Sequence, residues 1–172
     1  MQETDAQQHK IGRALTGLSR GFAVAGGLIL TALTVLSVVS IAARVVIGKP
    51  LPGDFELVEM GCGIAVFAFL PYCHLKRGNV IVDFFTLKAS DALKRALDIA
   101  GHVVYLGIAL LLLWRMILGG LDKYDSHEST MILAVPLWIG FVPIALSIVL
   151  LIAAVAYTLW RDAAALAGSA AP

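Results

Sequence analysis

The sequence predicts an all-α integral membrane protein with four transmembrane helices, and three observations support this fold class. First, 59% of its 172 residues are hydrophobic and only 15% are charged, whereas soluble domains average about 25% charged residues. Second, four apolar segments are each long enough to cross a bilayer, which takes about 20 residues. Third, lysine and arginine are distributed unevenly among the tails and loops that flank the four apolar segments. We therefore expect a single membrane domain over residues 1–172.

The four spans follow from the lengths of the apolar segments. They are expected at about 22–47, 54–77, 96–121 and 132–160. The tails, 1–15 and 162–172, are expected to be flexible. The fourth segment contains Pro136, which suits the first turn of a helix, and Pro143, which suits a kink.

The connector between the first two spans carries clear helix-breaking signals. Gly48 and Gly53 enclose two prolines, a composition that cannot continue a helix. Asp54 is placed as the N-cap of the second helix, and Glu56 in its first turn complements the helix dipole. These residues predict a sharp turn that brings the first two spans side by side.

Residues 80–95 are too polar to span a membrane and too apolar to stay in water. Apolar side chains such as Phe84 and Leu87 alternate there with charged ones such as Lys88 and Lys94. We expect an amphipathic segment lying along the cytoplasmic interface between the second and third spans. The alternative is that these residues extend the third helix into water.

The distribution of basic residues predicts the orientation, because lysine and arginine in short loops mark the cytoplasmic side. With both termini inside, nine of the 13 basic residues are cytoplasmic. These nine are Lys10, Arg13, Arg20, Lys76, Arg77, Lys88, Lys94, Arg95 and Arg161. The outer side would hold Arg44, Lys49, Arg115 and Lys123. Both termini are therefore expected in the cytoplasm, and Lys76, Arg77 and Asp83 are expected to form a cytoplasmic topology anchor.

Two stretches resemble motifs for catalysis or metal binding, but each lacks a feature that the motif requires. The GxSxG pattern at 17–21 needs a strand-to-helix turn in a soluble sheet, but here it precedes a membrane span. Its glycines, with Ala23 and Gly27, suit close helix packing instead. His127-Glu128 begins like HExxH, but Met131 stands where the second histidine is needed. No catalytic residue, cofactor site or metal site is predicted, and the net charge of +1 argues against nucleic acid as a partner.

The cysteines and histidines leave one alternative open. Cys62 and Cys73 are about 16 Å apart along a helix, too far for a disulfide. His74 and His102 both lie toward the cytoplasmic side, where a pair of histidines could ligate haem b. The other interpretation is that they are interfacial side chains hydrogen-bonded to water or lipid.

Short motifs along the chain resemble the small membrane subunit (the Q-type small permease) of tripartite ATP-independent periplasmic (TRAP) transporters. The resemblance rests on Arg44, Gly53-Asp54-Phe55-Glu56-Leu57-Val58-Glu59, Pro71-Tyr72, Lys76-Arg77-Gly78-Asn79-Val80, Val82-Asp83, Glu128-Ser129, Leu133 and Pro136-Leu137-Trp138. Each motif is degenerate, but their order and spacing on a four-span chain are specific. Asn79 departs from the histidine that family members often carry there.

The resemblance implies a non-enzymatic, multi-pass protein of the bacterial inner membrane. Its implied partners are a large multi-span permease subunit, a periplasmic substrate-binding protein and membrane lipid. It implies uptake of an organic acid or related solute, driven by a sodium gradient, with this chain as a scaffold. A haem-b electron carrier and a free-standing tetraspan scaffold are the alternatives from other classes.

Two groups of charges are the candidate interaction residues. Acidic residues gather toward the outer side of the membrane, where a binding protein would dock; the alternative is that they are solvated caps. They are Asp54, Glu56, Glu59, Asp122, Asp125 and Glu128. Arg44 and Glu59 lie at matching depth in neighbouring helices, so we expect them to form an intramembrane ion pair. Alternatively, Arg44 extends to phosphates while Glu59 faces water or the large subunit.

Overall fold

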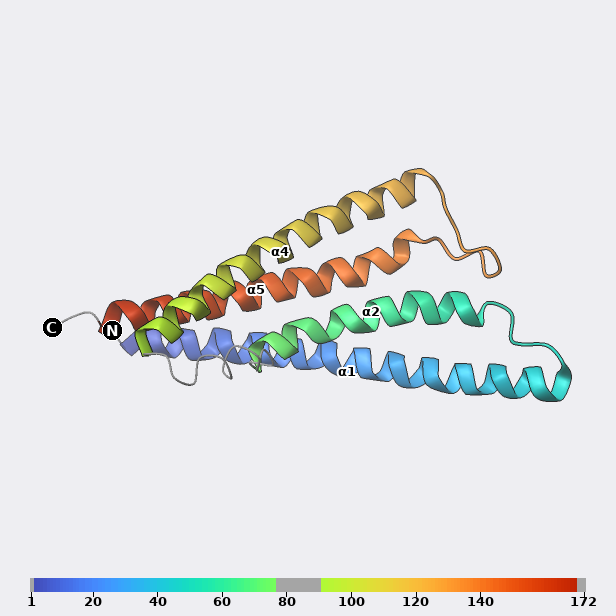
Figure 1. The fold of residues 1–172 in the computed structure, drawn as a ribbon, viewed down its shortest axis with the longest axis horizontal. Helices are drawn as coiled ribbons and strands as arrows, with labels where there is room; N and C mark the ends of the chain where they lie inside the picture. Colours follow the sequence, from blue (N-terminus) through green and yellow to red (C-terminus); the bar gives the residue numbers. More distant parts are fainter. Residues whose placement is uncertain (1, 77–90, 170–172) are drawn as a thin grey trace.

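The computed structural model describes residues 2–76 and 91–169, and these form four long helices that run alternately up and down (Figure 1). The helices are α1 (Gln2–Ile47), α2 (Asp54–Leu75), α4 (Asp91–Asp125) and α5 (Trp138–Ser169). Each contains a segment long and apolar enough to cross a membrane: Gly12–Ile47, Asp54–Leu75, Leu97–Asp125 and Trp138–Ala163. The all-helical fold with four candidate membrane spans is confirmed.

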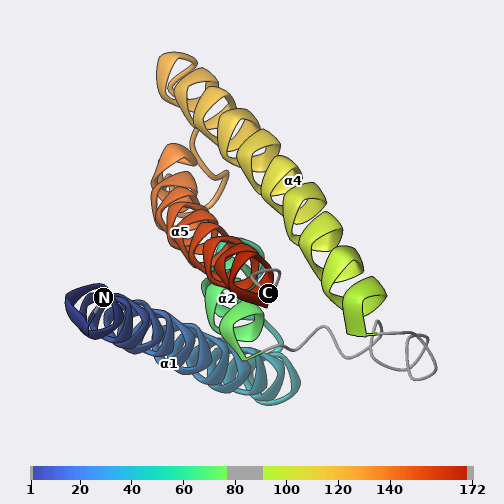
Figure 2. The ribbon, with the colours of Figure 1, turned by 90° about the vertical axis from the view of Figure 1, so that its left-hand side faces the viewer.

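The helices form two hairpins that meet through α2 and α5. Helix α1 packs along α2 and touches α5, α2 packs against α5, and α4 packs mainly against α5, with ring contacts from His102 and Tyr105 to His74 of α2. Figure 2 shows α4 slanting away from α1 and α2 on the far side of α5. Helices α1 and α4 are therefore the outer helices, and each has only one side covered.

Small residues bring α1 and α2 together. A Cβ built on Gly26 would lie 3.2 Å from the carbonyl oxygen of Ala65, and one on Gly61 would lie 2.7 Å from a methyl group of Leu33. By contrast, Gly17, Gly21 and Gly27 have nothing within 4 Å of an added Cβ. Within the described part of the chain, the prediction that these three glycines serve close helix packing is therefore wrong.

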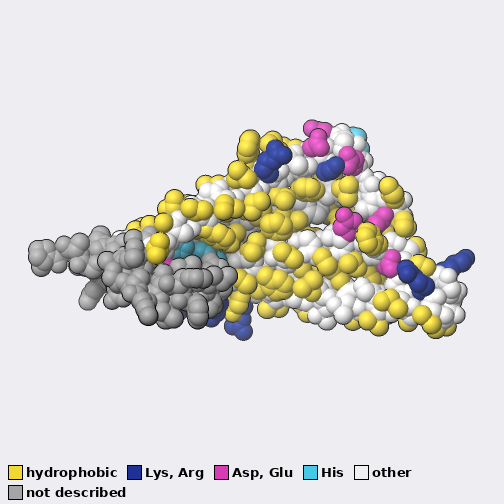
Figure 3. Space-filling view, in the orientation of Figure 1, with side chains coloured by type: hydrophobic (Ala, Val, Ile, Leu, Met, Phe, Trp, Pro, Cys, Tyr) yellow, Lys and Arg dark blue, Asp and Glu magenta, His cyan; other side chains and the backbone are white. Residues whose placement is uncertain are grey.

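The core is narrow and lies where α5 meets α2 and α4. Its fully buried side chains include Ala65, Ala109, Ile148, Leu151 and Val155. The outer helices instead expose large apolar side chains; Val46 of α1 is 83% exposed and Trp114 of α4 is 60% exposed. Figure 3 shows hydrophobic side chains over most of the face it presents, with acidic ones gathered at one end. This surface suits lipid or another membrane subunit.

Helix bounds and predicted spans differ at both tails. Helix α1 begins at Gln2 and α5 continues to Ser169, because polar residues end an apolar span without breaking a helix. Helix α4 begins at Asp91, inside the predicted interfacial segment. Residues 80–90 of that segment lie outside the described residues.

Candidate functional site

The two ends of the helices carry different polar structures. The loop end is formed by the connectors 48–53 and 126–137, and the terminal end holds the start of α1 and the end of α5 (Figure 1).

The connector 126–137 is a compact loop closed by its own backbone. Thr130 N–H donates to the carbonyl of Val135 at 3.0 Å, and Val135 N–H donates to the Thr130 hydroxyl at 3.1 Å. Ser129 and Pro136 form an antiparallel bridge, so Pro136 belongs to this loop and α5 starts after it, at Trp138. The loop thus presents residues 131–134 as an ordered tip.

Glu56 holds this tip against the start of α2. Its Oε1 accepts the N–H of Ile132 at 2.8 Å, and its Oε2 accepts the N–H of Leu133 at 3.0 Å. Hydrogen bonds from N–H groups to a carboxylate are stronger than those between neutral groups. The predicted helix-dipole residue is thus also the link between the two connectors.

Leu133 completes this link by packing over Gly53. Gly53 has φ 79°, and a Cβ there would lie 2.4 Å from Cγ of Leu133. Gly53 also occupies the N-cap position of α2, so the prediction that Asp54 is the N-cap is off by one residue. Glycine meets both requirements, because it adopts positive φ without strain and leaves room for Leu133.

Asp54 ties α2 to α1. One carboxylate oxygen accepts the hydroxyl of Ser40, and the other accepts the N–H of Phe55 at 2.8 Å. Ser40 is only 2% exposed, and its hydroxyl oxygen accepts the N–H of Leu51 at 3.3 Å. This carboxylate therefore fixes the turn between the first two helices.

A third acidic residue of the loop end is also engaged. Lys123 donates to Glu128 at 2.6 Å, and this hydrogen bond holds the pKa of Glu128 below its ordinary value. The side chains of Glu59, Asp122 and Asp125 are exposed and make no hydrogen bond or ion pair in the part of the chain that the structure describes. These three carboxylates are therefore the ones available to a partner.

The predicted pairing of Arg44 and Glu59 has no counterpart in the isolated chain. Both side chains are exposed, and no ion pair joins them within the described residues. Arg44 instead attracts the carboxylate of Asp54. Pairing of Arg44 with Glu59 inside an assembled complex stays a prediction.

The terminal end contains a buried polar cluster built around His74. This side chain is 6% exposed, and its Nε2 lies 2.9 Å from the hydroxyl oxygen of Thr158. The Thr158 hydroxyl also lies 2.9 Å from the carbonyl oxygen of Val155, to which it is assigned as donor. In this hydrogen-bond network His74 donates from Nε2 to Thr158, and its buried Nδ1 has no partner among the described residues.

Neighbouring rings complete the cluster. The ring of Tyr105 stacks on the His74 ring, with centroids 5.3 Å apart. The ring of His102 meets the His74 ring edge to face, with centroids 5.4 Å apart. Asp162 Oδ2 lies 3.8 Å from His102 Nδ1. His74 is thus bonded within the protein, which contradicts the expectation of bonds to water or lipid. Direct contact between the two imidazoles leaves no space for a porphyrin between them.

The remaining candidate residues fall at the end of α2 and beyond. Lys76 is exposed, and its ammonium lies 5.8 Å from the ring centroid of Tyr72. Arg77 and Asp83 lie outside the described residues. Ser19 of the GxSxG pattern is fully buried within α1, unlike the exposed serine of a nucleophile elbow. Among the described residues, no three His, Cys, Asp or Glu side chains gather to hold a metal ion.

Sequence reasoning missed the contacts of Ser40 and Thr158, and it named Leu133 only as part of the family resemblance, without its contact with Gly53. Each acts on a residue distant in sequence, so no local pattern identifies it. Gly53 carried a signal, because it ends a Pro-Leu-Pro-Gly run.

Four helices long and apolar enough to cross a membrane, joined by polar links at their ends in the described part of the chain, indicate a multi-span membrane protein. The profile of the family described as "Tripartite ATP-independent periplasmic transporters, DctQ component" matches residues 33–165. The chain therefore belongs to the DctQ family, a non-enzymatic component of TRAP transporters. No curated protein and no solved structure matches it.

Proposed function

We propose that this chain scaffolds the large multi-span subunit of a TRAP transporter and helps to dock the periplasmic substrate-binding protein. The observation that carries this proposal is the exposed apolar surface of α1 and α4. Each outer helix packs on only one side of the four-helix unit, so its other side is available to a membrane partner. Solute uptake, of an organic acid or a related compound driven by a sodium gradient, then belongs to the assembled transporter.

The loop end faces the periplasm in this proposal, and both termini face the cytoplasm. The uneven distribution of lysine and arginine supports this orientation. In the same orientation, Lys76, Arg77 and Asp83 anchor the cytoplasmic side, and residues 80–95 lie along its interface. The inner membrane of a bacterium is the corresponding location.

Docking of the binding protein is assigned to the loop end. Met131 is fully exposed at the loop tip, and Glu56 holds the next two residues in place. The exposed carboxylates of Glu59, Asp122 and Asp125 lie on helices that end at the same side. An ordered apolar tip beside unpaired acidic groups offers a preformed surface, which lowers the entropic cost of binding.

A scaffold role, without substrate or ion transport by this chain alone, is supported by the continuity of its spans. Transporters place their sites at broken helices near the membrane midplane. Here α2 continues through Pro71 and α5 continues through Pro143. The described spans therefore contain no unwound segment at either proline.

Co-expression tests this function. The chain should co-purify with the large multi-span subunit of its transporter, and proteoliposomes containing the chain alone should show no solute uptake. The complete transporter with its binding protein should take up solute. Sodium-dependent uptake by the chain alone would contradict the scaffold role, and so would full transport activity of the large subunit without it.

The pairing of Arg44 with Glu59 is tested in the same assembly. Arg44→Glu and Glu59→Arg should each lower co-purification with the large subunit, and the double variant should recover much of the loss. Equal failure of the double variant would show that each residue acts separately.

A further inference from the structure

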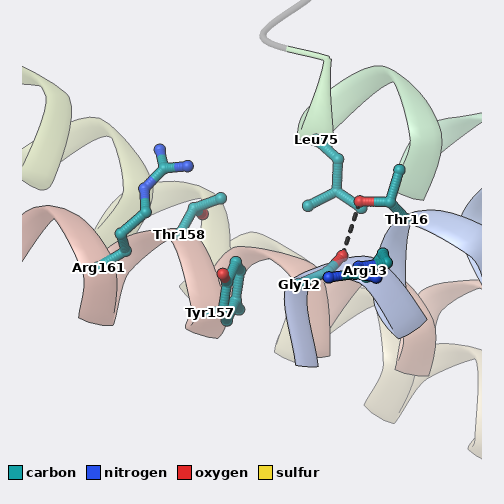
Figure 4. A pocket seen from close by; sticks show the side chains of 7 residues that line it. All are labelled: Gly12, Arg13, Thr16, Leu75, Tyr157, Thr158 and Arg161. Atoms are coloured by element: carbon teal, nitrogen blue, oxygen red, sulfur yellow. Dashed lines mark hydrogen bonds between the residues drawn. The ribbon is translucent and has the colours of Figure 1, made fainter. Parts of the chain in front are cut away.

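A cavity of about 350 Å³ opens at the terminal end between α1 and α5. Arg13 of α1 and Arg161 of α5 belong to its lining, and Tyr157 lies between them (Figure 4). The volume is within the range of ligand pockets, about 300–1,000 Å³. None of the described residues that line this cavity is acidic.

The hydrogen-bond inventory of the lining favours an anion. Thr16 donates its hydroxyl proton to the carbonyl of Gly12 at 2.8 Å, and Thr158 donates to Val155, so neither proton is available to a ligand. Arg161 uses two of its nitrogens for Asp162, at 3.1 Å each. Arg13 makes no hydrogen bond or ion pair within residues 12–76 and 91–163. Besides the Tyr157 hydroxyl, the lining carries guanidinium N–H groups, and only these guanidinium groups are positively charged.

Arg161 directly follows Trp160, where the fourth apolar segment of the sequence ends. Arg13 lines the same cavity from α1, so both arginines lie beside this end of the segment. Trp160, which is half exposed beside Arg161, is a residue type enriched at membrane–water interfaces. The phosphates of phospholipids occupy this depth.

We propose that this cavity binds the phosphate of an anionic phospholipid between Arg13 and Arg161. A guanidinium engages a phosphate through two parallel hydrogen bonds, which a lysine cannot do. Gly12 contributes by its lack of a side chain, since a Cβ there would lie 2.5 Å from the Tyr157 hydroxyl. The bound lipid links α1 to α5, and the proposal holds for either orientation in the membrane.

Native mass spectrometry of the full-length chain in mild detergent tests this site, with phosphatidylglycerol as the probe. The unaltered chain should retain one phosphatidylglycerol after delipidation. The variant Arg13→Gln/Arg161→Gln should bind it at least about tenfold more weakly, because loss of hydrogen bonds to a charged group costs that factor or more. The control Arg20→Gln/Arg115→Gln changes two exposed arginines outside the cavity and should bind as the unaltered chain does.

Two further arms distinguish the sources of the anion. Phosphatidylcholine, which carries no net charge, should bind at least about tenfold more weakly than phosphatidylglycerol. Inorganic phosphate at millimolar concentration should neither bind the delipidated chain nor displace phosphatidylglycerol. Equal retention by the cavity variant, equal binding of phosphatidylcholine, or tight binding of inorganic phosphate would each overturn the proposal. Arg13→Gln alone keeps the test valid if the double variant does not fold, because Arg13 has no partner in the described fold.

Discussion

The loop end and the terminal end use their polar residues in different ways. At the loop end, carboxylates of Asp54 and Glu56 bind backbone and hydroxyl groups of other segments near the surface. At the terminal end, the imidazole of His74 is buried between three helices and bonds to Thr158. The first arrangement orders a surface, whereas the second joins helices internally.

This difference shows how charge near a membrane can mislead. Six acidic residues seemed equally suited to a partner, but three of them are engaged inside the chain. The surface that we propose for partner binding is therefore smaller than the sequence indicates, and it consists of Glu59, Asp122, Asp125 and the loop tip.

Loss of His74 should have the largest effect, because the terminal end depends on its internal packing. We expect His74→Ala to lower the free energy of unfolding by about 2–5 kcal/mol, as for other large-to-small changes at buried sites. Thr158→Val should cost about 1–3 kcal/mol, since it leaves the Nε2–H group unpaired. Denaturant titration followed by circular dichroism measures both changes.

The control for this prediction is His127→Asn, at an exposed histidine of the loop end with φ 51°. Asparagine tolerates positive φ, so stability should change little. A loss equal to that of His74→Ala would show that the buried cluster has no special role.

Two glycines separate backbone strain from packing at the loop end. Gly48 and Gly53 have φ 78° and 79°, but only Gly53 faces Leu133. Gly48→Ala should lower the free energy of unfolding by about 1–2 kcal/mol, because alanine is strained in the left-handed backbone conformation. Gly53→Ala should lower it distinctly more, because the added Cβ also meets Leu133. Thermal unfolding of both variants measures the difference.

The double variant Gly53→Ala/Leu133→Ala should lose only as much free energy of unfolding as Gly48→Ala does, because the clash between the added Cβ and Leu133 is removed. Equal costs for the two single variants would show that contact between Leu133 and Gly53 contributes nothing.

Glu56 should control the mobility of the loop tip with a smaller effect on overall stability. A nitroxide label at Met131→Cys reports on this mobility, with Cys62 and Cys73 replaced by alanine. Glu56→Gln should increase it, because an amide offers one acceptor oxygen where the carboxylate offers two. Glu59→Gln, a matched change at an exposed side chain without a hydrogen bond or ion pair among the described residues, should leave the spectrum unchanged. Identical spectra for both variants would contradict the role of Glu56.

The pair of Lys123 and Glu128 should have the smallest effect, since exposed ion pairs are screened by water and salt. Its pH dependence has a definite sign. The folded-state pKa of Glu128 is lower than its ordinary value of 4.5, so the stabilisation is complete above pH 4.5 and fades as the pH falls through the lowered value. The melting temperature of Glu128→Gln should therefore differ from that of the unaltered chain at pH 7 and converge with it in acid. A constant difference at every pH would argue against this pair.

Much of the fold was predictable because membrane spans depend on apolar length, which is a local property of the sequence. The turn at 48–53 was also predictable from its glycines and prolines. The contacts of Glu56 with Ile132 and Leu133 were not, because they join segments far apart in the sequence through backbone N–H groups that no residue type marks. The burial of His74 depends on which face of α2 meets α5, and a nearly uniform apolar helix does not reveal that face.

The account depends most directly on which side of the membrane the loop end occupies. Single cysteines at Lys49→Cys, Ser126→Cys and Lys88→Cys, in a background without Cys62 and Cys73, can be treated with a membrane-impermeant thiol reagent in intact spheroplasts. We predict labelling at positions 49 and 126, and labelling at position 88 only after the membrane is opened. Labelling at position 88 in intact spheroplasts, with protection at 49 and 126, would place the loop end in the cytoplasm and contradict its role in docking the periplasmic protein.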